Sequence, residues 1–296
     1  MKNIFTKLLA GLAIAATLGV ASAAKAANTA DTIVIIDESG SMGGEQAWIR
    51  SMIQTLDLDL QAAGVTNNRY GLVGFGKTSP GTFGRSINVG GGLFGSASDF
   101  ATAAATGLVA NGSIEDGYAG IDYALDNYTF RNGAAKNVIF ITDEDRDVRN
   151  TTLNFTDTLN ALKSKNILFN SVLRNPFSGD GGSGALGIDF NNNAYYADGM
   201  GGVTSTGGGL VGNGAGTTET DYVPLSLQTR AASWDLSKFR QGGVLADSFT
   251  KAFVSIKVQE IVTEDPTSVP EPTSIIGLGV VAAGALSATK RKKQKA

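Results

Sequence analysis

Short apolar runs of strand length alternate along residues 30–262 with segments in which apolar residues recur every three or four positions. The first kind of segment is typical of buried β-strands, and the second is typical of amphipathic helices. Alternation of the two calls for right-handed crossovers, which build a mostly parallel sheet with helices on both faces. The sequence therefore predicts a doubly wound α/β domain over residues 30–262.

The same pattern places the individual elements. Strands are predicted at residues 32–36, 70–75, 86–89, 137–141, 167–173 and 231–236. Helices are predicted at residues 42–63, 98–108, 115–127, 153–163 and 245–259.

An insertion at about residues 175–228, after the fifth predicted strand, is rich in Gly, Asn, Ser and Thr. This composition favours loops and turns, with irregular or short β structure, over a packed core. The insertion leaves the sheet at the carboxyl end of a strand, and long loops over such an edge often carry function.

Two carboxylates follow two of the most apolar predicted strands. Asp37-Glu38-Ser39-Gly40-Ser41 comes directly after the first strand, and Asp143 follows the strand at 137–141. In parallel α/β sheets, ligands bind outside the carboxyl ends of the strands. If the two strands are neighbours, Asp37 and Asp143 converge on one edge. Carboxylate and hydroxyl oxygens spaced two residues apart are suited to a hard divalent cation.

The D-x-S-x-S motif resembles the metal-ion-dependent adhesion site of von Willebrand factor type A domains, and the resemblance covers most of residues 31–260. It implies that Asp37, Ser39 and Ser41 ligate Mg²⁺ or Ca²⁺ from a first loop and that Asp143 ligates it from a third. This chain has Thr-Asp-Glu at the third loop, where the family usually has Thr-Asp-Gly.

The second loop departs from the family pattern. Counting back from Ala119-Gly120-Ile121 places Glu115 where the family usually has a threonine, with Ser113 and Asp116 within reach. We take Glu115 as the candidate ligand, and the other two as alternatives. A third carboxylate would favour cation binding, shift the preference toward Ca²⁺ and disfavour an acidic ligand.

Residues 143–147 also have the D-x-D-x-D spacing that begins a calcium-binding loop. The sixth loop position is Val148 instead of glycine, and the twelfth is Asn154 instead of glutamate. We therefore interpret the segment as an acidic loop that contributes one site carboxylate, Asp143.

The N-terminus has the pattern of a secretory signal peptide. Lys2 and Lys7 precede an apolar run from Leu8 to Ala24 that closes on small residues, with cleavage expected after Ala26 or Ala23. An N-terminal membrane anchor is the alternative. We assign residues 1–26 to the signal peptide.

The C-terminus contains three parts in order: Pro270-Glu271-Pro272, a short apolar run at 275–288, and a basic cluster at 290–295. This order resembles the PEP-CTERM sorting signal of Gram-negative bacteria. The resemblance implies processing by an exosortase-type membrane protease and delivery to the cell surface or matrix. We assign residues 263–272 to a linker and 273–296 to the sorting signal. The apolar helix of this signal is expected to anchor the protein in the membrane before processing. A single-pass tail anchor is the alternative.

Composition excludes several classes of function. The chain contains no cysteine and no histidine, so it has no disulfide framework, no Ser-His-Asp arrangement and no imidazole metal ligand. Of 24 basic residues, eight lie in the two processed ends, which leaves 16 basic against 27 acidic residues, about −11. This negative charge argues against nucleic acid as a partner.

The sequence as a whole favours a non-catalytic binding or adhesion module with a divalent-metal site. Its expected partner is a surface protein or an exopolysaccharide. The alternatives are a structural matrix protein whose ion only stabilises the fold, and a metal-dependent hydrolase that uses Asp37 as nucleophile or ligand.

Overall fold

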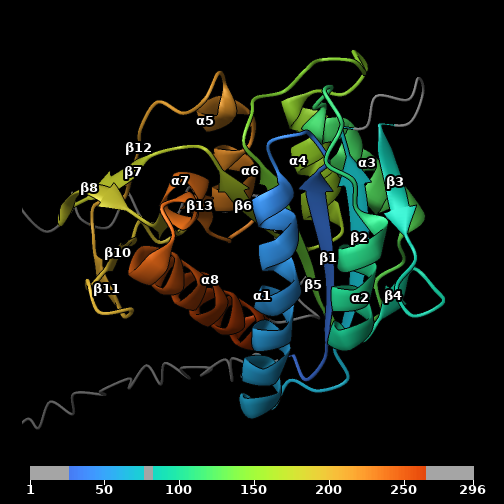
Figure 1. Cartoon of the computed structure of the whole chain (residues 1–296), viewed down its shortest axis with the longest axis horizontal. Coiled ribbons are helices and arrows are strands. Elements are labelled where there is room, and N and C mark those ends of the chain that lie inside the picture. The colour runs from blue at the N-terminus through green and yellow to red at the C-terminus, as the bar shows by residue number, and fades with distance from the viewer. Residues whose placement is uncertain (1–26, 77–82, 265–296) are drawn as a thin grey trace, which may run out of the picture.

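The computed structural model describes residues 27–76 and 83–264 (Figure 1). The predicted signal peptide and sorting signal lie outside the described residues. Each strand and helix predicted from the sequence is present, with ends that differ by a few residues. The α/β class with a largely parallel central sheet is confirmed.

In the described part of the chain, ten strands form one mixed sheet. Its centre is parallel and runs in the order β13 (Ser233–Asp235), β6 (Ile167–Leu173), β5 (Ala135–Thr142), β1 (Ala30–Asp37) and β2 (Arg69–Phe75). Antiparallel strands flank it: β3 (Gly84–Ile87) and β4 (Phe94–Gly95) beside β2, and β9 (Gly187–Ile188), β10 (Ala194–Ala197) and β11 (Val203–Thr206) beyond β13.

The helices cover both faces of this sheet (Figure 1). One face carries α1 (Gly43–Ala62), α2 (Ala97–Gly107), α7 (Leu236–Arg240) and α8 (Gly243–Thr263). The other carries α3 (Gly117–Asn127), α4 (Phe155–Ser164) and α6 (Val223–Gln228), with α5 (Thr218–Asp221) leading into α6. None of the described helices is both long and apolar enough to cross a membrane.

Strand β1 explains why two layers of helices are needed. Its residues alternate between faces, as the period of a strand requires. Val34 and Ile36 belong to the core cluster under α1, α2 and α8, whereas Ile33 and Ile35 belong to the cluster under α3, α4 and α6. All four side chains have no solvent exposure. The first apolar run of the sequence is therefore an interior strand with helices packed on both faces.

The insertion is more ordered than its composition predicts. Its short β structure is confirmed: β9, β10 and β11 extend the main sheet, and β7 (Phe177–Gly179), β8 (Gly182–Ala185) and β12 (Leu210–Val211) form a separate small sheet. The expectation that it lacks a packed core is wrong, because Leu186, Ile188 and Tyr195 are buried. Glycine permits this packing, since a Cβ on Gly187 would lie 2.6 Å from the Ser233 carbonyl oxygen.

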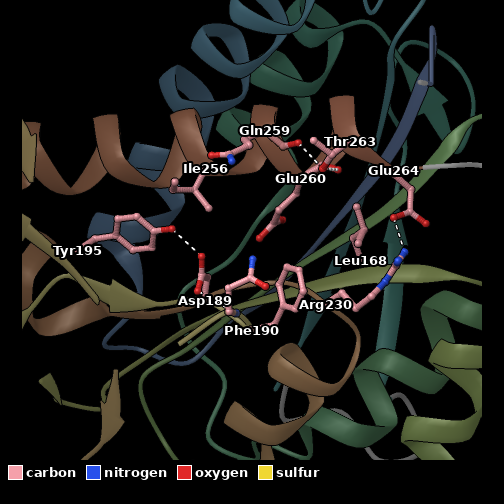
Figure 2. Close-up of a pocket in the computed structure, with 11 residues that line it drawn as sticks. Leu168, Asp189, Phe190, Tyr195, Arg230, Ile256, Gln259, Glu260, Thr263 and Glu264 are labelled. Carbon is pink, nitrogen blue, oxygen red and sulfur yellow. Dashed lines mark hydrogen bonds and ion pairs between the residues drawn. The ribbon is translucent and has the colours of Figure 1, made fainter. Parts of the chain in front are cut away.

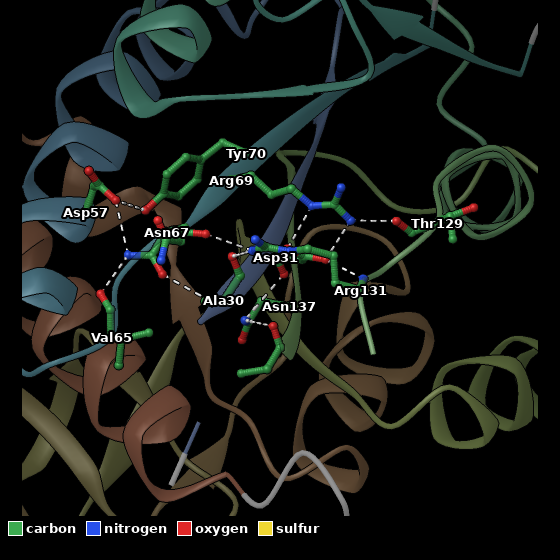
Figure 3. A network of polar contacts seen from close by, with 12 residues as sticks. Ala30, Asp31, Asp57, Val65, Asn67, Arg69, Tyr70, Thr129, Arg131 and Asn137 are labelled. Atoms are coloured by element: carbon green, nitrogen blue, oxygen red, sulfur yellow. Dashed lines mark hydrogen bonds and ion pairs between the residues drawn. The ribbon is translucent and has the colours of Figure 1, made fainter. Parts of the chain in front are cut away.

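A buried carboxylate ties the loops at the amino ends of the central strands together. Figure 3 shows the guanidinium groups of Arg69 and Arg131 converging on Asp31, whose side chain is fully buried. Arg69 donates to both carboxylate oxygens at 2.8 and 2.7 Å, and the Arg131 backbone N–H donates at 2.6 Å. Burial raises the pKa of Asp31, but these hydrogen bonds outweigh it and hold the pKa below its ordinary value of 3.8.

Replacing this carboxylate should remove a pH-dependent share of the stability. Because the folded-state pKa of Asp31 is depressed, its contribution is present above pH 3.8 and is lost as the pH falls below that value. We expect Asp31→Asn to lower the free energy of unfolding by about 2–3 kcal/mol at pH 7, as measured by urea titration.

The difference between the wild type and Asp31→Asn should shrink at pH 3. Asp59→Asn, which changes an exposed carboxylate on α1, is the control and should have little effect. An equal loss in Asp31→Asn at both pH values would contradict this account of Asp31.

Candidate metal centre

Asp37 is the last residue of β1, and its carboxylate is fixed by the ends of two adjacent strands. Its Oδ1 accepts a hydrogen bond from the Ser39 backbone N–H at 2.6 Å. Its Oδ2 accepts one at 2.9 Å from the hydroxyl of Thr142, the last residue of β5. β1 and β5 are parallel neighbours, as the sequence-based prediction required. The Asp37 side chain is therefore buried and held in one orientation.

Three of the predicted ligands are joined by hydrogen bonds. The Ser39 and Ser41 hydroxyl oxygens are 3.1 Å apart, and the Ser41 hydroxyl donates to Asp143 Oδ1 at 3.0 Å. Ser39 is buried and pairs with Gly112 through a single β-bridge, whereas Ser41 is exposed. The first and third predicted loops thus meet in a row of oxygen atoms at the carboxyl edge of the sheet.

Glu38 holds the second loop against the first, a role that the sequence analysis missed. Its buried carboxylate accepts hydrogen bonds from Arg85 Nε at 2.8 Å and from the Val109 backbone N–H at 2.9 Å. Its backbone carbonyl accepts from Asn111 and Gly112 at 3.0 and 2.8 Å. An acidic residue immediately after a buried strand was the available signal, although nothing in the sequence named its partner.

The carboxylate of Asp116, one of the alternative second-loop ligands, is already engaged by other residues of the protein. Its buried carboxylate forms an ion pair with Arg146 Nε at 2.7 Å. It also accepts hydrogen bonds from the backbone N–H groups of Arg149 and Asn150 at 2.9 and 2.8 Å. Asp116 therefore fastens the second loop to the third. The other alternative, Ser113, is exposed.

Glu115 is the second-loop acid that lies beside Asp37. A Cβ on Gly76 would lie 2.9 Å from Asp37 Oδ1 and 3.6 Å from Glu115 Cγ, so both side chains border the same space. Burial, followed by the negative charge of Asp37 and by Glu144, raises the pKa of Glu115 to about 8. The position predicted from the family pattern is thus next to the first loop.

The electrostatics of this edge suit a cation. Burial raises the pKa of Asp37 to about 7, although hydrogen bonds from Ser39 and Thr142 oppose the shift, and the charge of Asp143 adds to it. Both Asp37 and Glu115 would be more easily ionised beside a positive charge. Oxygen-only donors of this kind fit Mg²⁺ or Ca²⁺.

The carboxylates do not form a cage by themselves. Within residues 27–76 and 83–264, no three Asp, Glu, His or Cys side chains are close enough together to hold one ion. An ion at this edge would therefore depend on the hydroxyl groups of Ser39 and Ser41 as well as on carboxylates.

Arg240, the last residue of α7, completes the arrangement and was not foreseen. Its Nη1 donates to Asp143 Oδ2 at 2.8 Å, and its Nε donates to Glu45 Oε1 at 2.6 Å. Its Nη2 donates to the Ser41 carbonyl oxygen at 3.2 Å. Because Arg240 is 97 residues beyond Asp143 in the chain, no local sequence pattern connects them.

The acidic loop at 143–147 does not turn its carboxylates toward one point. Asp143 faces Ser41 and Arg240, as described above. Asp145 accepts a 3.4 Å hydrogen bond from the Thr217 hydroxyl, and Asp147 accepts one at 3.3 Å from the Glu115 backbone N–H. This divergence fits the interpretation of an acidic loop with one site carboxylate. It also brings Thr217, in the later part of the insertion, against the third loop.

Away from this edge, a pocket of about 310 Å³ lies between α8 and the turn after β9 (Figure 2). Its acidic groups have partners: Asp189 accepts from the Tyr195 hydroxyl at 2.7 Å, and Glu264 pairs with Arg230 at 2.6 Å. Glu260 accepts from Lys257 at 3.1 Å. Of these pairs, Arg230–Glu264 joins the end of α8 to the segment before β13.

Comparison with known proteins finds no matching family model and no matching curated protein. Among solved structures, the chain is similar to an aerotolerance-related membrane protein from Bacteroides fragilis NCTC 9343 with multiple mutations to serines. The two are 14% identical, the match covers 78% of this chain and 99% of that one, and the TM-score is 0.44. At this level of similarity the match carries no argument about function.

The close packing at Gly76 provides a test of the described geometry. Gly76 and Gly64 have nearly equal φ values, +88° and +86°, but a Cβ at Gly64 would meet nothing within 4 Å. Gly64→Ala should therefore cost only the backbone strain, about 1–2 kcal/mol. Gly76→Ala should cost at least about 1 kcal/mol more in urea unfolding, because its methyl group would press on Asp37. Equal losses would contradict the placement of Asp37 and Glu115.

Proposed function

We propose that this protein is an exported, non-catalytic binding module of the von Willebrand factor type A kind. It would bind a divalent cation through Asp37, Ser39, Ser41 and Asp143, with Glu115 as the second-loop ligand. The observation that carries the proposal is the hydrogen-bonded row from Ser39 through Ser41 to Asp143, next to the buried Asp37. A row of this kind places oxygen donors from two loops at the edge where α/β sheets bind ligands.

A bound cation would offer a coordination position to an oxygen atom of the partner. Glu115 adds a carboxylate to this edge, and its pKa of about 8 reflects burial and the charge of Asp37. The surplus of carboxylates favours Ca²⁺ over Mg²⁺ and repels an acidic partner. A hydroxyl-rich, uncharged partner such as an exopolysaccharide fits this balance better, and a surface protein is the alternative.

The two ends of the chain support a location outside the cytoplasm. The signal peptide and the PEP-CTERM-like tail would carry the domain to the cell surface or matrix of a Gram-negative bacterium, after processing by an exosortase-type protease. Both segments lie outside the described residues, so this part of the proposal depends on their sequence alone.

Two other functions use the same residues. In a structural matrix protein the ion would only stabilise the fold and would not take part in binding a partner. Loss of surface binding in Ser39→Ala/Ser41→Ala, with an unchanged melting temperature in the absence of metal, would argue against that alternative. A metal-dependent hydrolase would instead turn over a phosphoester or glycoside and lose this activity in Asp37→Ala.

Calorimetric titration of Mg²⁺ and Ca²⁺ into the full-length protein in mild detergent tests the proposal. We expect about one ion per chain for the wild type and none for Asp37→Ala, because Asp37 is the buried carboxylate that anchors the first loop. Asp145→Ala is the matched control from the acidic loop and should bind normally.

Two results would contradict the proposed site. One is absence of ion binding in the wild type. The other is binding that is lost in Asp145→Ala but kept in Asp37→Ala, which would place the ion in the acidic loop. Thermal unfolding of each variant checks that the fold is retained.

A further inference from the structure

Arg240 places a positive charge directly on one of the predicted metal ligands. Its guanidinium donates to Asp143 Oδ2 at 2.8 Å, while the other oxygen of the same carboxylate, Oδ1, accepts from Ser41 at 3.0 Å. The carboxylate of Asp143 therefore contacts both the Ser41 hydroxyl and the positively charged guanidinium of Arg240.

The position of Arg240 is fixed by three segments of the chain. Besides Asp143, the side chain binds Glu45 in the first turn of α1 at 2.6 Å and the Ser41 carbonyl oxygen at 3.2 Å. Glu45 is buried, and the Arg240 side chain is only 30% exposed. An arginine remains protonated in proteins, so this charge is permanent.

We propose that Arg240 is a built-in counter-ion that sets a low affinity of this site for divalent cations, an inference that rests on the proposed function. Two physical effects act in the same direction. The guanidinium neutralises part of the negative charge that attracts the ion. It also occupies the oxygen of Asp143 that does not face Ser41, which makes this carboxylate a poorer ligand.

The arrangement has a consequence for how the site responds to ions. α7 and the first and third loops are linked through the side chain of Arg240, so a cation that draws Asp143 toward itself weakens the ion pair between Asp143 and Arg240. Ion binding therefore opposes an existing ion pair, and the site should respond to millimolar concentrations of Ca²⁺ instead of retaining an ion permanently.

Arg240→Met tests this role, since methionine keeps an unbranched apolar stem and removes the charge. In calorimetric titrations of the full-length protein with Mg²⁺ and with Ca²⁺, we expect affinity to rise about tenfold over the wild type. The metal-free variant should melt at a lower temperature, because Glu45 and Asp143 lose their partner. Saturating Ca²⁺ should then raise its melting temperature by more than it raises that of the wild type.

Two further variants separate charge from structure. Arg240→Lys keeps the positive charge and should restore an affinity close to that of the wild type. Arg69→Met is the matched control: Arg69 is 28% exposed and binds the buried Asp31 at the opposite edge of the sheet. It should lower the melting temperature and leave ion affinity unchanged. If Arg240→Met does not fold, Arg240→Gln replaces it, because glutamine can still donate to the Ser41 carbonyl.

The outcomes distinguish this inference from the proposed function. Ion binding by the wild type with equal or weaker affinity in the uncharged variant overturns the role of Arg240 and leaves the metal site intact. Binding only in the uncharged variant supports the role of Arg240 and contradicts the proposed function, which requires the wild type to bind an ion. Absence of binding in both proteins overturns both.

Discussion

Parallel pairing of β1 with β5 is the constraint on which the rest of the site depends. The register sets Ile36 beside Ile141, so the two strands end together and their next residues, Asp37 and Thr142, meet through a 2.9 Å hydrogen bond. Asp143 then follows directly at the same edge. The side chains of both strands are packed on two faces, and a slip by one residue would move each of them into the opposite layer, so the packing of both layers fixes the register. The core thus fixes the positions of the site oxygens.

Ion pairs with arginine organise the surrounding loops. Arg85 holds Glu38 of the first loop, Arg146 holds Asp116 of the second, and Arg240 holds Asp143 of the third. Among the described residues, Asp37 and Glu115 form no such pair, and burial raises the pKa of both carboxyl groups. A divalent cation between the first and second loops would favour the ionised forms of both groups.

Prediction from the sequence succeeded where a residue's position follows from its own strand. The apolar run before Asp37 and the one before Asp143 specified two buried strands and hence the location of both carboxylates. Prediction failed where an effect depends on distant partners. Arg240 reaches Asp143 through the fold, and the packing of Leu186 and Ile188 depends on small residues that a composition argument assigns to loops. Counting along the second loop selected Glu115 and left Asp116 as an alternative, and only the fold shows that Asp116 is paired with Arg146.

The location of a bound ion is the most direct test of this account. Crystals of the protein soaked in Mn²⁺, with anomalous diffraction measured at the manganese edge, would show where a divalent cation binds. The account predicts one peak at the carboxyl ends of β1 and β5, in contact with the hydroxyl groups of Ser39 and Ser41 and with Asp143 or Asp37. A peak confined to the carboxylates of Asp145 and Asp147, or no peak at saturating Mn²⁺, would contradict it.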